Sequence, residues 1–284
     1  MDKYTVFWEK KALRLRGNLI CLDSPKVMGI LNLTPDSFYS GSRFGSDLAL
    51  LKKAEEMLDQ GAFILDIGAY SSRPGAPEVS EQEEEGRLLP SLKRLVSEFP
   101  DAYFSVDTFR SGIARKAAEA GASVINDISG GNLDPEMFAT IASLDIAYVL
   151  MHMRGSPETM IHLNEYEDLI LDLIRYFQQK LEILTNLGVR DIILDPGFGF
   201  AKNINQNFSL LKELSGFSML EYPVLAGLSR KSLIYKTLNV SAEEAMPGTI
   251  ALNMVVLQQG AAFLRVHDVR EAIETIKLFN KLYF

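Results

Sequence analysis

The sequence of 284 residues contains only one cysteine, Cys21. A single thiol cannot form a disulfide within the chain, and it cannot assemble a metal site built from cysteines. A free cysteine of this kind usually behaves as a small apolar residue. We therefore expect Cys21 to be buried and to have no chemical role.

Long apolar runs are also missing. No run reaches the roughly 18 residues that a membrane-spanning helix requires. The first residues, MDKYTVFWEKK, lack the apolar core of a signal peptide. These absences predict a cytoplasmic protein that does not enter a membrane.

Positive charge is in the minority, with 29 Lys and Arg against 37 Asp and Glu and a formal net charge of −8. This balance excludes the strongly basic surface that nucleic acid or an anionic membrane attracts, so we expect neither as a partner. A small anionic substrate is compatible with it, because a few cations at close range outweigh a negative background.

Eight short runs rich in β-branched and apolar residues alternate with helical stretches. They are residues 27–32, 63–68, 103–107, 123–127, 147–152, 191–195, 223–229 and 262–267. Strands that alternate with helices form parallel sheets, and eight such units predict an α/β fold of the (β/α)8 TIM-barrel type. No linker divides the chain, so residues 1–284 are expected to form one domain.

The first 26 residues precede this alternation and are expected to form a β-hairpin extension. The strand-like segments TVFW and LRLRGNLICL flank a turn predicted around residues 9–11. Such a hairpin would cover the bottom of the barrel, away from the chemistry.

Helix signals support the same plan. Ser80 and Glu83 have the spacing of a capping box, and residues 165–187 have apolar side chains at helical spacing before Gly188. The acidic run of residues 83–85 would lie in a first helical turn, where we expect it to be solvated surface.

Polar residues stand at the ends of the predicted strands or directly after them. In a βα barrel the active site forms at the carboxyl ends of the strands and in the loops that follow. Seven side chains should therefore converge on one mouth: Asn32, Asp107, Asn126, Asp195, Lys231, Arg265 and His267.

The cations among them predict a phosphate or diphosphate site. Arg265 and His267 alternate along the last strand and so point to the same side. Lys231 precedes a helix whose N-terminus, at Ser232, adds backbone N–H groups that favour an anion. The alternative is that Arg265 forms an ion pair with a neighbouring carboxylate such as Asp268.

The remaining polar residues are open to several uses. Asp107, Asn126 and Asp195 match the adjacent N–H and NH₂ donors of a pyrimidinone ring, but they equally suit metal binding or general acid–base work. Asn32 offers an oxygen that could help hold Mg²⁺ against a diphosphate, or it caps the turn before Pro35. His152 and His162 are expected to be polar core or rim residues.

Seven motifs, in order from residue 32 onward, resemble those of the dihydropteroate synthase family. They are NLTPDSF (32–38), SSRPGA (71–76), FSVDTFR (104–110), INDISGG (125–131), LDPGFGFAK (194–202), GLSRKS (227–232) and RVHDV (265–269). The resemblance implies an enzyme of folate biosynthesis that joins 6-hydroxymethyl-7,8-dihydropterin diphosphate to 4-aminobenzoate, giving 7,8-dihydropteroate and diphosphate. It also implies a homodimer and Mg²⁺.

The resemblance further implies roles for particular residues, with Asp107, Lys231, Arg265 and His267 as the catalytic ones. By similarity, the pterin ring is held by Asp107, Asn126, Asp195 and Lys231. The diphosphate and Mg²⁺ are held by Asn32, Arg265 and His267. Ser72 and Arg73 are substrate-binding residues of the second loop. Ser232 and the helix N-terminus meet the aminobenzoate carboxylate, and Pro74 and Phe200 line the apolar slot for its ring.

Two loops depart from the family pattern. Ser40 stands where the family usually has Asp, and Tyr70 stands where it usually has Glu. These changes keep open a catalytically silent pterin-binding paralogue, which Lys231, Arg265 and His267 argue against. A pterin-dependent methyltransferase domain is the other alternative, and it would have no need of a diphosphate site.

Overall fold

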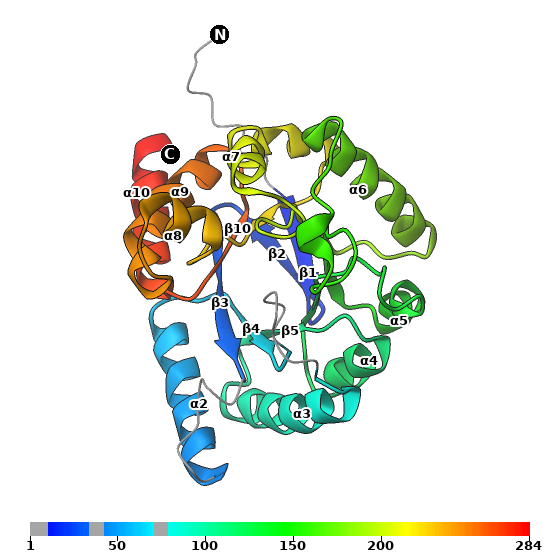
Figure 1. The fold of residues 1–284 in the computed structure, drawn as a ribbon. Coiled ribbons are helices and arrows are strands. Elements are labelled where there is room, and N and C mark those ends of the chain that lie inside the picture. The colour runs from blue at the N-terminus through cyan, green and yellow to red at the C-terminus, as the bar shows by residue number, and fades with distance from the viewer. Residues whose placement is uncertain (1–10, 34–42, 71–78) are drawn as a thin grey trace.

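The computed structural model describes residues 11–33, 43–70 and 79–284, and it shows a ring of eight parallel strands inside a ring of helices (Figure 1). The strands are β3 (Lys26–Asn32), β4 (Ile64–Gly68), β5 (Tyr103–Asp107), β6 (Val124–Asp127), β7 (Ala147–Met151), β8 (Ile192–Asp195), β9 (Leu225–Ala226) and β10 (Phe263–Val266). The sheet has the order β8-β7-β6-β5-β4-β3-β10-β9, and a bridge between Leu194 and Val224 joins its two ends. The predicted TIM barrel is confirmed.

Helices follow the strands and cover the outside of the barrel. The α-helices are α2 (Arg43–Asp59), α3 (Glu81–Glu98), α4 (Ser111–Glu119), α5 (Met137–Leu144), α6 (Leu169–Asn186), α7 (Ile204–Lys212), α8 (Ser232–Leu238), α9 (Met246–Gln258) and α10 (Val269–Tyr283). Short 3₁₀ turns are η1 (Met160–His162), η2 (Leu214–Leu220) and η3 (Glu243–Ala245). Among the described residues, no helix is long and apolar enough to cross a bilayer.

Alternation along each strand separates an outer core from the barrel interior. On β4, Leu65 and Ile67 belong to the large apolar cluster between the strands and the helices. Ile64 belongs instead to a second cluster inside the bottom of the barrel, and Asp66 lies buried one layer above it. The interior is thus apolar at the bottom and polar toward the carboxyl ends of the strands.

An antiparallel hairpin, β1 (Lys11–Leu15) and β2 (Asn18–Leu22), packs against the bottom layer. Its turn is at Arg16 and Gly17, whose φ angles are 49° and 77°, so the prediction of one strand-like segment over residues 13–22 is wrong. The turn predicted around residues 9–11 falls mostly outside the described residues. A two-residue turn with positive φ at both positions matches the twist of a hairpin, and Gly adopts such angles without strain.

Alternation along the hairpin decides which of its side chains face the barrel. Leu13, Leu15 and Leu22 point into the bottom cluster, and Cys21 on the opposite face is exposed. The expected burial of Cys21 is therefore wrong, because adjacent residues of a strand face opposite sides and Leu22 takes the inner face.

The helix signals are largely confirmed. Ser80 and Glu83 form both hydrogen bonds of the capping box at the start of α3. Helix α6 begins at Leu169 with Asp168 as its N-cap, which trims the predicted segment, and Gly188 has the positive φ of 89° beyond its end. The acidic run is not all solvated, because Glu84 is fully buried.

Candidate active site

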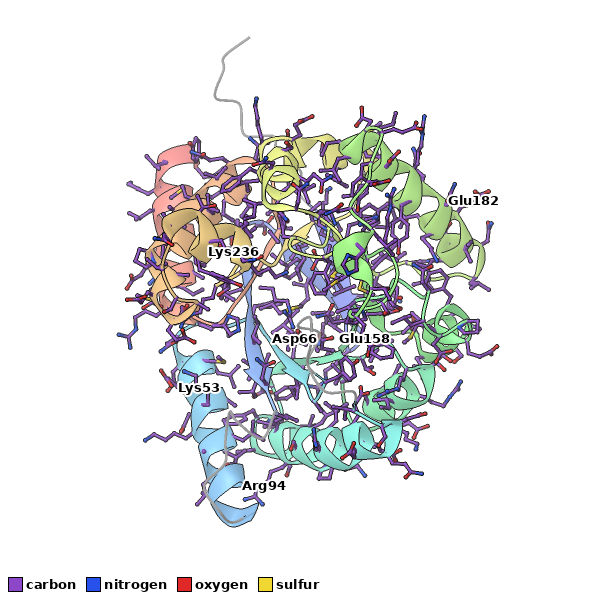
Figure 2. The ribbon with its side chains drawn as sticks, viewed as in Figure 1. Lys53, Asp66, Arg94, Glu158, Glu182 and Lys236 are labelled. Carbon is purple, nitrogen blue, oxygen red and sulfur yellow. The ribbon has the colours of Figure 1, made fainter. Side chains whose placement is uncertain are left out.

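The mouth of the barrel is formed by inward-facing side chains at the upper ends of the strands. These residues are Asp66, Asp107, Asn126, Asp195 and Arg265. Figure 2 shows Asp66 in the middle of the ring, whereas Lys53, Arg94 and Glu182 lie on the surrounding helices. Parallel pairing places Asp107 of β5 opposite Asn126 of β6, so these two side chains lie at the same level. The predicted convergence of strand-tip residues is confirmed for Asp107, Asn126, Asp195 and Arg265; Asp66 was not among those predicted.

Arg265 is the centre of this group. Its Nε donates to Asp66 Oδ2 at 2.6 Å, and its terminal nitrogen donates to Asp107 Oδ2 at 2.8 Å. Asn126 Nδ2 donates to the same Asp66 oxygen at 3.0 Å. The alternative that Arg265 forms an ion pair with a carboxylate is thus confirmed, but with Asp66 and Asp107. The partner named for it, Asp268, is wrong, because Asp268 binds Arg230 at 2.6 and 2.9 Å.

Burial dominates the electrostatics of the mouth. It raises the pKa of Asp107 to about 7, although the Arg265 guanidinium opposes the shift, and Asp66 adds to it. Burial also raises the pKa of Asp195 above its ordinary value, against the favourable charge of Lys231. Burial disfavours the charge on Arg265, yet Asp66 and Asp107 hold the pKa of that guanidinium above its ordinary value. Carboxylates held in this way readily accept hydrogen bonds from donors on a ligand.

Lys231 reaches this group from the N-terminus of α8. Its ammonium donates to the Phe198 carbonyl and lies 4.7 Å from the centre of the Phe200 ring. Burial lowers the pKa of Lys231 to about 8, while Asp195 works in the opposite direction. The structure therefore places Lys231 and Phe200 together with Asp195, as the sequence predicts.

The loop between β8 and α7 carries one wall of the mouth. Asp195 Oδ1 accepts a hydrogen bond from the Gly197 N–H at 2.8 Å, and Gly197 has a φ of 72°. A Cβ at this glycine would lie 2.1 Å from the His152 carbonyl oxygen, so only glycine fits. The close approach ties the ends of β7 and β8 together.

His267 and Ser232 occupy the side of the mouth formed after β9 and β10. His267 Nδ1 lies 2.9 Å from Ser229 Oγ, and the His267 N–H donates to the same hydroxyl at 3.2 Å. Ser232 is the first residue of α8, directly after the N-cap Lys231. His267 therefore points toward Ser229, while Arg265 points across the barrel toward Asp66 and Asp107.

Asn32 ends β3 and pairs in register with Gly68, which in turn pairs with Asp107. It is thus level with the mouth, as predicted. Ser72, Arg73 and Pro74 of the second loop, and Ser40 of the first, lie outside the described residues.

Two functional candidates were not selected from the sequence. Asp66 stands two residues before the tip of β4, and the alternation rule places it on the inner face. Lys202 lies in the LDPGFGFAK motif and is 8% exposed, but nothing in the sequence assigned it a task. His152 is buried, as expected of a core histidine, and His162 is exposed.

The oxygen-rich mouth suits a hard cation only in combination with a ligand. Among the described residues, no group of three or more His, Cys, Asp or Glu side chains could hold a metal by itself. Mg²⁺ usually takes one or two protein oxygens and completes its shell with phosphate and water. An amide oxygen at Asn32, beside a diphosphate, is compatible with that mode of binding.

Comparison with known proteins gives a consistent result. The sequence matches the family described as pterin binding enzyme over residues 28–267. It is 39% identical over 265 residues to the dihydropteroate synthase of Escherichia coli (strain K12), and the match covers 93% of each chain. The fold is similar to a crystal structure of Yersinia pestis dihydropteroate synthase with a sulfonamide drug, with a TM-score of 0.89, 40% identity, and coverage of 96% of this chain and 99% of that chain. It is also similar to Xanthomonas albilineans dihydropteroate synthase in complex with 7,8-dihydropteroate, with a TM-score of 0.86, 33% identity, and coverage of 96% and 98%.

Proposed function

This chain belongs to the pterin binding enzymes and, among them, to the dihydropteroate synthases, and we propose that the mouth of its barrel binds both substrates of that reaction. The reaction transfers a pterinylmethyl group from 6-hydroxymethyl-7,8-dihydropterin diphosphate to 4-aminobenzoate. The products are 7,8-dihydropteroate and diphosphate. One observation carries the assignment to this mouth: carboxylates, an amide and two cations are held together above an apolar barrel floor.

The pterin ring is proposed to occupy the space between Asp107, Asn126 and Asp195. A pterin presents an N–H and an exocyclic NH₂ side by side, and a buried carboxylate accepts both. Lys231, held beside Asp195, would donate to the carbonyl side of the ring. Donors and acceptors of the ring would then each face a partner of opposite kind.

Arg265 and His267 are proposed to bind the diphosphate, with Asn32 supplying a ligand to Mg²⁺. When bound, Mg²⁺ would neutralise charge on the diphosphate oxygens. Arg265 is already anchored by Asp66 at 2.6 Å, so its guanidinium is preorganised for an anion that approaches the mouth. The fully buried Asp66 thus acts as a positioning residue for this cation.

These residues support an ionising substitution. The bond between the pterin methylene carbon and the diphosphate oxygen breaks, and the electron pair leaves with diphosphate. Asp107 and Asp195 favour the positive charge that spreads over the pterin, while Arg265 and His267 favour the charge on the leaving group. The arylamine nitrogen then forms the new C–N bond and loses a proton, and the chain supplies no covalent nucleophile.

The aminobenzoate is proposed to lie between Phe200 and the N-terminus of α8. The Phe200 ring provides an apolar face, and Ser232 provides a hydroxyl for the carboxylate. Ser72, Arg73 and Pro74 are proposed to complete this site from the second loop.

We further propose that the chain is cytoplasmic and forms a homodimer. Support for a dimer comes from the C-terminal helix, where Leu278, Leu282 and Phe284 are 63%, 67% and 71% exposed. Light scattering during size-exclusion chromatography would test this state, and a monomer at micromolar concentration would contradict it.

The function is tested by measuring diphosphate release from the purified protein, given the pterin diphosphate and Mg²⁺, with and without 4-aminobenzoate. We expect release that depends on aminobenzoate and yields 7,8-dihydropteroate. Pterin binding without turnover would indicate the silent paralogue. Methyl transfer from a methylated pterin, with no diphosphate release, would indicate the methyltransferase.

A further inference from the structure

We propose that Lys202 and His152 form a buried positioning pair that fixes the loop of residues 196–201 as a wall of the pterin pocket. The proposal deepens the proposed function and rests on it for the identity of the ligand. Neither residue is assigned a role by the motifs or by the substrate contacts described above. Both act at a distance from the reacting atoms, through the backbone between Asp195 and α7.

The ammonium of Lys202 is enclosed by its own loop. Its Nζ lies 3.0 Å from the Gly197 carbonyl oxygen, 3.0 Å from the Phe200 carbonyl oxygen and 3.1 Å from His152 Nδ1. An ammonium has three N–H donors, and these three acceptors use all of them. The loop therefore curls around a fully satisfied charge.

The same loop supplies several contacts of the mouth. The Gly197 N–H donates to Asp195 Oδ1 at 2.8 Å, while the Gly197 carbonyl accepts from Lys202. The Phe198 carbonyl accepts from Lys231, and the Phe200 ring lies under the Lys231 ammonium. A shift of this loop would therefore displace the Gly197 N–H from Asp195, and it would also displace the Phe198 carbonyl and the Phe200 ring from Lys231.

The contacts determine the protonation of His152. When Lys202 is an ammonium, all three of its protons are donated, so His152 Nδ1 accepts, and the imidazole is neutral with its proton on Nε2. Burial lowers the pKa of His152 well below its ordinary value, and the charge of Lys202 acts in the same direction. Burial likewise lowers the pKa of Lys202 to about 7, although Asp195 opposes that shift.

His152 also links the lysine to the frame of the barrel. Its backbone N–H donates to the Asp195 carbonyl at 2.9 Å, at the junction of β7 and β8. Its ring packs edge-on against Tyr176, with ring centres 4.8 Å apart. Lys202 is thus held on one side by a rigid strand end and on the other by the loop that it organises.

The first test replaces Lys202 by Met, which keeps the length of the side chain and removes the ammonium. The matched control is Lys212→Met on the exposed side of α7. We expect the Lys202 variant to bind a diphosphate-free dihydropterin about 10-fold more weakly, because the displaced loop weakens the hydrogen bonds around Asp195 and Lys231. Binding of inorganic diphosphate with Mg²⁺ should stay unchanged, because Arg265 and His267 lie elsewhere in the mouth.

The split between the two ligands separates positioning from general damage. Equal losses for dihydropterin and diphosphate would overturn the proposal, since they would indicate a disordered barrel. Unchanged pterin affinity in calorimetry would overturn it as well.

A second test uses two substitutions of nearly equal shape at the other partner. His152→Asn keeps an acceptor oxygen near the position of Nδ1, whereas His152→Leu removes it. We expect the Asn variant to bind dihydropterin within about threefold of the parent and the Leu variant to resemble the Lys202 variant. Equal affinities for these two variants would overturn the pair, even if Lys202→Met failed to fold.

A spectroscopic measurement is independent of the enzyme's substrate. Nitrogen-15 NMR of the three histidines, assigned with His162→Gln, should show His152 as the neutral Nε2–H tautomer. The Lys202→Met variant should lose this fixed tautomer, and an Nδ1–H tautomer in the parent protein would contradict the proposal. If the parent bound no pterin, the proposed function would fail while this measurement still decided whether the pair exists.

Discussion

The two ends of the barrel interior are built by the same strands and differ in almost every physical respect. At the bottom, Leu15 and Leu22 of the hairpin pack against Ile64 and Phe263 in a closed apolar cluster. At the mouth, the next inward residues of the same strands include Asp66 and Arg265, and they are charged. A step of two residues along a strand therefore leads from the apolar bottom to the charged mouth.

The difference shows a division of tasks along the strands. Apolar burial at the bottom stabilises the fold, and the close packing there leaves no space for a ligand. Buried charges at the mouth contribute little net stability, because desolvation offsets their mutual attraction. They are explained by what they bind, so changes at the two ends should separate stability from function.

The largest expected effect comes from Asp195→Asn at the mouth. The amide keeps an oxygen for the Gly197 N–H but replaces a charge-bearing acceptor by an NH₂ that faces the donors of the pterin. We expect pterin affinity to fall about 1000-fold, or roughly 4 kcal/mol, in calorimetry. The free energy of unfolding should stay equal or rise, since a buried carboxylate is removed.

A loss of stability comparable to a core deletion would contradict that expectation. It would mean that Asp195 holds the barrel together as well as the ligand. The mouth would then stabilise the fold as the bottom does, and the division of tasks between the two ends would not hold.

The second largest effect is expected from Leu15→Ala, a substitution in the apolar cluster at the bottom of the barrel. Leu15 is fully buried, so its truncation leaves a cavity beneath the barrel floor. We expect the free energy of unfolding in urea to fall by about 3 kcal/mol, with pterin affinity unchanged. Leu19→Ala on the outer face of the hairpin, where Leu19 is 69% exposed, is the matched control and should change little. Weakened pterin binding in the Leu15 variant would show that the hairpin supports the site.

The third effect is a pH dependence carried by Asp107. Burial raises the pKa of this carboxyl from 3.8 to about 7 in the folded state, so between these values the folded protein holds a proton that the unfolded chain has released. Stability from this group is complete below about pH 4 and is lost as the pH rises toward 7. Asp107→Asn removes this contribution.

We therefore expect the free energy of unfolding of the parent, minus that of Asp107→Asn, to decrease by about 3 kcal/mol from pH 4 to pH 7. The difference between the two sets of unfolding curves reports Asp107 together with its coupling to Arg265 and Asp66, because every other carboxylate is common to both proteins. A difference that stays nearly constant over this range would show that Arg265 keeps Asp107 ionised in the folded state.

These contrasts also explain which features were predictable from sequence. The strands ending at Asn32, Asp107 and Asp195 were located to within a residue, since apolar runs ending in a polar residue report a buried strand and its tip together. The motifs then placed Asn126 and Lys231 at the same mouth. Local pattern and topology suffice for residues that stand at the ends of elements.

The remaining features depend on contacts between distant segments. Glu84 was expected in solvent, yet Thr108 and Arg110, 24 and 26 residues away, donate to its carboxylate at the end of β5. Lys202 is buried because its own loop curls around it and β7 supplies His152. Strand β9 covers only Leu225–Ala226, whereas residues 223–229 were predicted as a strand. The segment after Ala226 turns toward α8, with a positive φ of 56° at Arg230.

The smallest expected effect is at Cys21, where the hairpin itself offers an inner and an outer face. Cys21 is exposed, and its neighbour Leu22 is buried in the bottom cluster. Cys21→Ser should therefore change the free energy of unfolding by less than about 0.5 kcal/mol. The native protein should react with one equivalent of a thiol reagent without denaturant, and pterin affinity should be unaffected. A thiol that reacts only after unfolding would place Cys21 on the inner face, and it would reverse the register of the hairpin that covers the bottom of the barrel.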